Sequence, residues 1–358
     1  MEFRKTIVTL LVSILLLGSL AGFAEGEDTA ASSDESKLVT GTLSMLNITE
    51  EEYAAFAAAQ LLTANQLVEE GYAHRSSVSE GIPEDFEISY YDTTDALLMA
   101  LNAGQIDGIL IYQNVARYLC ATNDTLRMRL TYNPDQPLNT FAKLVYGGIN
   151  GNDFSFLMME DRTELRDEFN AAIAEMKEDG TLDRLVEEQI DAMVDGSEIK
   201  PVELPRIDGA ETIKVAVTGA LPPMDYVAAN GEPAGFNTAV LAEIAQRTGK
   251  NIEPVVVDSF GRAAALASGV VDVVFWTRTS NAAHRIAAMT EDELNSKHAE
   301  LDPSMTEDEL QVIQAVDEMV DISAYGNADM PEGTICTDPY FSDVFNVIVP
   351  YATTPDNQ

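Results

Sequence analysis

A stretch of alternating strands and helices, residues 213–278, constrains the fold more than any other feature of the chain. Apolar runs with β character cover Ile213–Thr218, Ile252–Val257 and Val271–Trp276, and helical segments separate them. Alternation at this length builds a parallel sheet covered by helices. Small molecules bind such sheets at the carboxyl ends of the strands. We therefore predict an α/β fold with a small-molecule site near the ends of the first and last of these runs.

Three short motifs follow one another within this stretch. They are PPMDY at residues 222–226, GFNTAVLAEI at 235–244 and LASGVVDVV at 266–274. Together they resemble the first lobe of the family 3 extracellular solute-binding proteins, which serve ABC importers and have the periplasmic-binding-protein type II fold. The resemblance implies a two-lobed clamshell, each lobe a mostly parallel sheet flanked by helices. It also implies a small polar solute as ligand, an amino acid or related carboxylate, and an ABC transporter permease as partner.

A second α/β unit precedes the first. Residues 87–120 alternate between strand and helix, and LNAGQIDGIL at 101–110 parallels LASGVVDVVF at 266–275. In both copies the glycine ends a helix and the aspartate stands just before a buried strand. Two such turns can arise by chance, but in the family both lobes carry this pattern. A two-lobed chain therefore explains the repeat.

The order of the parts differs from that of the family. Asp167–Glu187, with helical apolar spacing interrupted at Gly180, resembles the family's closing helices. Here the second-lobe-like half and these helices come before the first-lobe-like half. A circular permutant that forms one clamshell and two incomplete copies in tandem both explain this order. We favour the permutant, because the halves are complementary and one full clamshell buries a better core.

The amino end predicts export. Basic Arg4 and Lys5 precede an apolar run, and small residues surround Ala24, which is typical of a cleaved signal peptide rather than an anchor. No cysteine stands directly after it, so we expect a secreted, cell-surface-associated protein without a lipid anchor. The expected parts are a signal peptide (1–24), a disordered acidic linker (25–37), a second-lobe-like α/β domain with closing helices (38–190), a linker (191–209), a first-lobe-like α/β domain (210–351) with a helical insertion (280–330), and a tail (352–358).

The candidate ligand-binding residues stand at strand ends. An arginine fork and hydroxyl groups neutralise a carboxylate, and aromatic rings cover the apolar part of a small ligand. In the family a threonine and an arginine after the fourth strand contact the ligand carboxylate, and an aspartate of the second lobe pairs with the ammonium. Here Tyr112 stands where that aspartate is expected, which argues against an α-amino acid as ligand. The candidates are Arg278 as first choice, Thr277, Thr279, Tyr226, Trp276, Asp225, Arg285, Tyr112 and Gln113.

Structural roles remain open for several of these residues. Arg278 can be a surface charge, and Tyr226 and Trp276 can be core residues. Cys120 and Cys336 fall in different expected lobes, where a disulfide would resist hinge opening. We therefore expect two buried thiols.

The composition disfavours several function classes. A formal net charge of −39 disfavours nucleic acid and anionic membrane surfaces as partners. The chain has no nucleophile-elbow or phosphate-cradling motif, and its three histidines lack metal-ligand spacing. We therefore expect a monomeric binding protein with no cofactor and no metal, not an enzyme. The alternatives are a dehydratase- or lyase-like enzyme on the same fold and a sensor or interaction module that binds no ligand.

Overall fold

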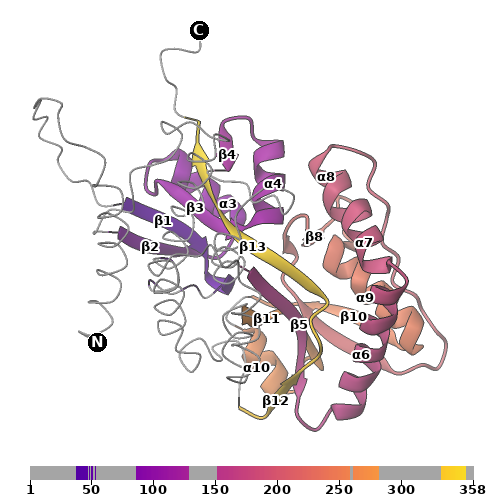
Figure 1. Ribbon diagram of the computed structural model, residues 1–358. Helices are drawn as coiled ribbons and strands as arrows, with labels where there is room; N and C mark the ends of the chain where they lie inside the picture. The colour runs from indigo at the N-terminus through magenta and orange to yellow at the C-terminus, as the bar shows by residue number, and fades with distance from the viewer. Residues whose placement is uncertain are drawn as a thin grey trace, which may run out of the picture.

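A computed structural model describes residues 38–46, 48, 50, 53, 86–128, 151–258, 261–281 and 332–351. Ten of the strands in these ranges form one continuous sheet (Figure 1). They are β1 (Leu38–Leu43), β2 (Phe86–Tyr91), β3 (Gly108–Tyr112), β4 (Leu126–Met128), β5 (Gly151–Met159), β6 (Thr212–Val217), β10 (Asn251–Val256), β11 (Val273–Asn281), β12 (Thr334–Cys336) and β13 (Phe341–Pro350). A separate small sheet contains β7 (Ala220–Leu221), β8 (Asp225–Val227) and β9 (Pro233–Ala234).

Helices cover this sheet in the order in which the sequence predicts them. Below, the segments Ser44–Leu46 and Val186–Asp191 are written η1 and η3, the latter a π-helix. The other helices are α3 (Thr94–Asn102), α4 (Gln113–Thr122), α6 (Thr163–Glu178), α7 (Thr181–Leu185), α8 (Ala192–Val194), α9 (Phe236–Thr248) and α10 (Arg262–Ala267).

The large sheet has two similar halves that share one strand. The first half-sheet has the strand order β2-β1-β3, and the second has the order β10-β6-β11-β5. Strands β2, β1 and β3 are parallel to one another, and so are β10, β6 and β11. Strand β13 lies between the halves and is antiparallel to its neighbours in both. Its first residues, Phe341–Val344, pair with β5, and Phe345–Ile348 pair with β3. The predicted α/β fold is therefore confirmed, as one continuous mixed sheet with parallel strands in each half; a separation of the halves into two lobes remains a prediction.

The repeated glycine–aspartate pattern has the same structural role in both halves. Gly104 and Gly269 follow α3 and α10 with φ of 66° and 71°, in the left-handed region that glycine tolerates. The Asp107 carboxylate then accepts a hydrogen bond from the Val39 amide at 2.8 Å, and that of Asp272 accepts one from the Lys214 amide at 2.9 Å. Each aspartate thus fixes the start of one strand to its parallel neighbour.

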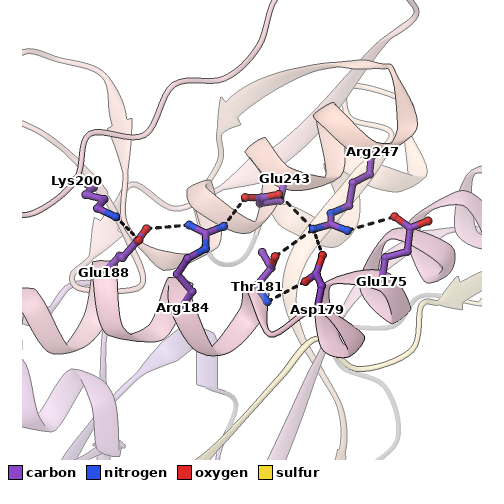
Figure 2. Close-up of polar contacts among 8 residues, drawn as sticks. All are labelled: Glu175, Asp179, Thr181, Arg184, Glu188, Lys200, Glu243 and Arg247. Atoms are coloured by element: carbon purple, nitrogen blue, oxygen red, sulfur yellow. Dashed lines mark hydrogen bonds and ion pairs between the residues drawn. The ribbon is translucent and has the colours of Figure 1, made fainter.

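The closing helices α6 and α7 pack against α9, on the second half-sheet. Gly180 breaks them apart with a φ of 75°, as the sequence predicts. A row of alternating charges joins the closing helices to α9 (Figure 2). Lys200 contacts Glu188, and Glu188 also binds Arg184. Arg184 in turn binds Glu243 of α9 at 2.8 Å. From α9, Arg247 reaches back to Glu175 and Asp179 at 3.2 and 2.8 Å and to the Thr181 hydroxyl at 3.1 Å.

One predicted boundary is wrong. The sequence places the end of the fourth strand at Trp276, but β11 continues to Asn281. The extension exists because β5 supplies a second partner, with Thr277 opposite Ser155 and Arg278 opposite Phe154. The register shifts between Val274 and Thr277, and Trp276 at this shift has a φ of 54°.

Several expectations lie outside the described residues. These are the signal peptide, the acidic linker, the tail, almost all of the insertion at 280–330, and Arg285. Cys120 and Cys336 are thiols that form no disulfide, as expected, but both are half-buried rather than buried. Burial raises the pKa of Cys120 to about 11 and that of Cys336 to about 12.

Candidate functional site

Hydroxyl groups and a carboxylate gather where β11, β5 and β13 meet. Ser155 lies opposite Thr277, and its Oγ lies 2.8 Å from Oγ1 of Thr279. On the other side of β5, the Ser342 hydroxyl donates to Oδ1 of Asp153 at 2.6 Å. Because side chains alternate along a strand, Asp153 and Ser155 lie on one face of β5. We call Asp153, Ser155, Thr277, Thr279 and Ser342 the hydroxyl cluster.

Thr277 is the member of this cluster whose hydroxyl has no hydrogen-bond partner among the described residues. Its side chain is fully buried, with 0% of its surface exposed. Within the described part of the chain, its Oγ1 makes no hydrogen bond. A buried hydroxyl in this condition costs about 1–3 kcal/mol relative to a satisfied one. A ligand atom that accepts from or donates to Thr277 would recover this free energy.

A buried arginine supports the irregular backbone beside the hydroxyl cluster. Arg262 of α10 is 4% exposed, and its Nη2 donates to the carbonyls of Phe275 and Trp276, the latter at 3.2 Å. Its guanidinium also lies 5.9 Å from the Phe275 ring centre. These carbonyls lie at the register shift, where the regular ladder is interrupted. Arg262 therefore satisfies backbone groups that the shift takes out of the ladder.

Asp225 has a structural role in the turn after β6. Its Oδ2 accepts hydrogen bonds from the Thr218 amide and hydroxyl and from the Gly219 amide, at 2.6–2.7 Å. Burial raises the pKa of this carboxyl, and the three donors oppose that rise. With these contacts, Asp225 fixes the turn that precedes Tyr226.

Trp276 and Tyr112 form an aromatic cluster that joins the halves. The Trp276 ring stacks on Phe154 with centres 3.8 Å apart, and Tyr112 lies 4.8 Å from Phe154 and 5.8 Å from Trp276. From β13, Phe345 stacks on Tyr112 at 4.9 Å, and Phe341 lies 5.7 Å from Trp276. All but the half-buried Phe341 are buried. The rings therefore pack as core between the half-sheets.

The start of α4 faces the second half of the chain. Gln113 opens this helix, and the next residue, Asn114, donates from its amide and its side chain to Asp343 of β13 at 3.2 and 3.1 Å. Further along α4, Tyr118 lies near Tyr226 of β8. Burial raises the pKa of Tyr226, and the Tyr118 phenol raises it further. Residues from both halves of the chain thus meet around one junction.

The structure adds residues that the sequence does not single out. Ser155, Asp153 and Ser342 join the predicted Thr277 and Thr279, but no local motif marks β5 as their neighbour. Only the antiparallel pairing brings them together. Asp343 likewise supplies a carboxylate, which lies beside Asn114, the residue that follows Tyr112 and Gln113.

A pocket of about 440 Å³ lies between α6, α7 and the start of β13. Its walls combine apolar side chains with Lys177 and Asp183. Asp153 and Ser342 of the hydroxyl cluster also line it. The cluster is therefore adjacent to this pocket.

Within the described ranges, no group of three or more histidine, cysteine or acidic residues is arranged to hold a metal ion. None of the helices described is both long and apolar enough to cross a bilayer.

Comparison with known proteins gives a partial match. Residues 213–291 match the family described as bacterial extracellular solute-binding proteins, family 3. No curated protein matches the chain. The stretch that matches contains β6 through β11 and the predicted Thr277–Thr279 segment.

Solved structures of binding proteins are also similar, at low identity. The aliphatic sulphonate binding protein SsuA of Escherichia coli is 11% identical, with 88% of this chain and 61% of that protein covered and a TM-score of 0.31. A substrate binding protein from Microbacterium hydrocarbonoxydans, complexed with 4-hydroxybenzoate hydrazide, is 12% identical, with 76% and 56% covered and a TM-score of 0.32. This chain thus spans less than two thirds of either protein.

A phosphate-binding protein of a Streptococcus pneumoniae ABC transporter is 9% identical, with 88% of this chain and 90% of that protein covered and a TM-score of 0.30. These three proteins have different ligands. Over residues 213–291, the chain is thus similar to the family 3 bacterial extracellular solute-binding proteins.

Proposed function

We propose that this protein is an extracytoplasmic solute-binding component of an ABC importer. It would capture a small polar solute between two lobes that correspond to the two half-sheets. The hinge would be β13, the strand that both halves share. Closure around such a hinge buries the ligand and creates the form that a permease recognises.

One observation carries the proposal: the buried Thr277 hydroxyl has no hydrogen-bond partner among the described residues, and it lies opposite Ser155 in the hydroxyl cluster. Arg278 follows it on the same strand and is half buried, but it pairs with Phe154 and so points to the opposite face of the sheet from Thr277. The hydroxyl cluster by itself suits a small anion or a neutral hydroxylated solute. The absence of an acid at position 112 makes a ligand without an α-ammonium the better fit.

Thermal-shift screening against small carboxylates, sulfonates, sugars and amino acids tests the proposal. At least one class should raise the melting temperature of the natural chain, and Thr277→Val should abolish that rise. As a matched control, Thr42→Val removes another fully buried threonine hydroxyl, which bonds to the Leu110 carbonyl far from the cluster. That variant should keep the ligand-induced rise. A folded natural chain that no compound stabilises would contradict the proposal.

A second candidate is a module that binds no small molecule. The buried packing of Tyr112, Trp276 and Phe154 between the halves favours it, because these rings leave no space for a ligand among themselves. The same screen separates the two candidates.

A further inference from the structure

A buried carboxylate lies on the one strand that joins the half-sheets. Asp343 is 6% exposed and belongs to β13, where it pairs with Asn152 of β5, two residues before the part of the strand that pairs with β3. Its Oδ2 accepts both hydrogen bonds from Asn114 at the start of α4, and its Oδ1 accepts one from the Val344 amide at 2.8 Å. The side chain therefore fixes α4 of the first half to the shared strand.

The same contacts extend to η3, which follows the closing helices. Oδ1 of Asn114 accepts a hydrogen bond from Nη1 of Arg117 at 3.0 Å. Nη2 of Arg117 binds Asp191 of η3 at 2.8 Å. The chain of contacts Asp343–Asn114–Arg117–Asp191 thus links β13, α4 and the closing helices. We call these four residues the junction relay.

We propose that the proton on Asp343 controls how tightly the two halves close, so that acidification closes the junction and alkalinity opens it. The inference concerns the junction itself and holds whichever ligand the protein takes. In the closed junction Asp343 is withdrawn from water, whereas opening would hydrate it. Because hydration favours the ionised carboxylate, the open form binds its proton more weakly.

The charges around Asp343 set the pH at which this exchange occurs. Burial raises its pKa to about 7, and the amides of Val344 and Asn114, the Asn114 side chain and the Arg117 charge oppose that rise. On β5 the opposite position is the neutral Asn152, with Asp153 beside it, and on β3 the titratable residue Tyr112 pairs with Phe345, two residues along β13. Asp191 faces the relay from η3. Arg117 is the cation that acts on Asp343 directly.

The sign of the effect follows from linkage. A carboxyl with a raised pKa in the closed form and an ordinary pKa of about 4 in the open form takes up a proton on closing. Closure is therefore favoured as the pH falls through 7. Between pH 8 and pH 6 the ratio of closed to open molecules should rise about tenfold.

The chain contains its own reporter for this change. Trp276 is the single tryptophan of the sequence, and it contacts Phe341 of β13 and Tyr112 of β3. An open junction would expose this ring to water and shift its emission to longer wavelength. Fluorescence of Trp276 therefore reads the junction without a label.

The test is the emission maximum of the full-length chain from pH 5 to pH 9. The natural chain should keep a constant emission maximum at alkaline pH and shift to the blue as the pH falls below about 7. Asp343→Asn, which mimics the neutral acid, should remain blue-shifted throughout. Arg117→Gln should move the midpoint to higher pH, because it removes the cation that lowers the pKa of Asp343, and this variant serves if Asp343→Asn does not fold.

Histidine is the side chain whose ordinary pKa lies in this range, and the sequence has three histidines. A variant with His74, His284 and His298 all replaced by glutamine should therefore keep the transition. Emission that does not change with pH in the natural chain would overturn the proposal. So would a transition that persists in Asp343→Asn or disappears in the histidine variant. Ligand screening has no part in these readings, so the solute-binding proposal can fail while this one stands.

Discussion

Thr42 and Thr277 are both fully buried threonines, but only Thr42 has a described hydrogen bond. We propose that this difference separates a residue that serves the fold from one that binds a ligand. Thr42 lies within the ladder of the first half-sheet. Thr277 lies where β11 leaves its regular register and meets Ser155. Functional side chains often keep such an unsatisfied group, because the ligand completes the hydrogen bond.

Replacing each threonine by valine should therefore affect stability differently. Thr42→Val should lower the free energy of unfolding by about 1–2 kcal/mol, because the Leu110 carbonyl loses its donor. Without ligand, Thr277→Val should change it by less than about 0.5 kcal/mol or raise it. Urea unfolding of both variants measures the difference. Equal losses would show that Thr277 has a hidden structural partner.

At the scale of elements, α6, α7 and α9 are held together by a surface network of charges in addition to their apolar faces. Arg247 lies at its centre, with its side chain mostly covered, and binds Glu175, Asp179 and Thr181. These contacts lower the pKa of Asp179 to about 2, first through the Thr181 hydrogen bond and then through Arg247. Such an acid stabilises the fold above its unfolded pKa near 4. That contribution is lost as the pH falls from about 4 to about 2.

Arg247→Gln should lower the free energy of unfolding at neutral pH by about 1 kcal/mol, because it removes a mostly buried positive charge that binds several partners. The matched change Arg184→Gln removes a more exposed arginine of the same network and should cost only a few tenths of a kcal/mol. The loss of stability between pH 4 and pH 2 should also be smaller in Arg247→Gln. Thermal unfolding across pH and salt concentration provides the measurement. A larger effect from Arg184 would place the centre of the network elsewhere.

Elements with a strong local pattern could be predicted from the sequence. The helix at Thr94–Asn102 lies within the segment 87–120 for which strand and helix were predicted, and it has clear local signals, because Thr93 caps it and Gly104 follows it. The apolar run GILIY forms a fully buried strand for the same local reason. In the candidate site, Thr277 and Thr279 were predictable because they follow such a run.

Ser155, Asp153 and the end of β11 were not predictable in this way. Their positions depend on pairing between strands that are far apart in sequence, and register between such strands is set by tertiary contacts. The role of Asp343 depends likewise on the distant α4. Local pattern thus predicts the elements, whereas long-range pairing creates the site.

At the scale of the whole molecule, the two halves of the chain are interleaved. Strand β5 from the first half of the chain lies between β11 and β13 from the second. The favoured interpretation of one permuted clamshell requires such exchange, whereas two tandem bodies would each keep their own strands. The division at residues 191–209 remains a prediction, but the pairing at β5 crosses it.

Interleaving predicts the behaviour of fragments. Residues 38–209 and 210–358, produced separately, should each lack cooperative unfolding, because the first loses β13 and the second loses β5 and the closing helices. Mixed together from denaturant, they should recover the circular dichroism and the melting transition of the intact chain. Independent folding of either fragment would contradict the single-body interpretation.

The position of β13 also has a consequence for the order of synthesis. It is the last of the described strands to leave the ribosome, yet it lies at the centre of the sheet. Until it emerges, β3 and β5 each retain an unpaired edge, and neither half of the molecule is complete. Folding must then proceed through contacts between residues far apart in the chain, which is slow. The nascent protein therefore remains unfinished, and open to binding by chaperones, until nearly all of the described chain has been made.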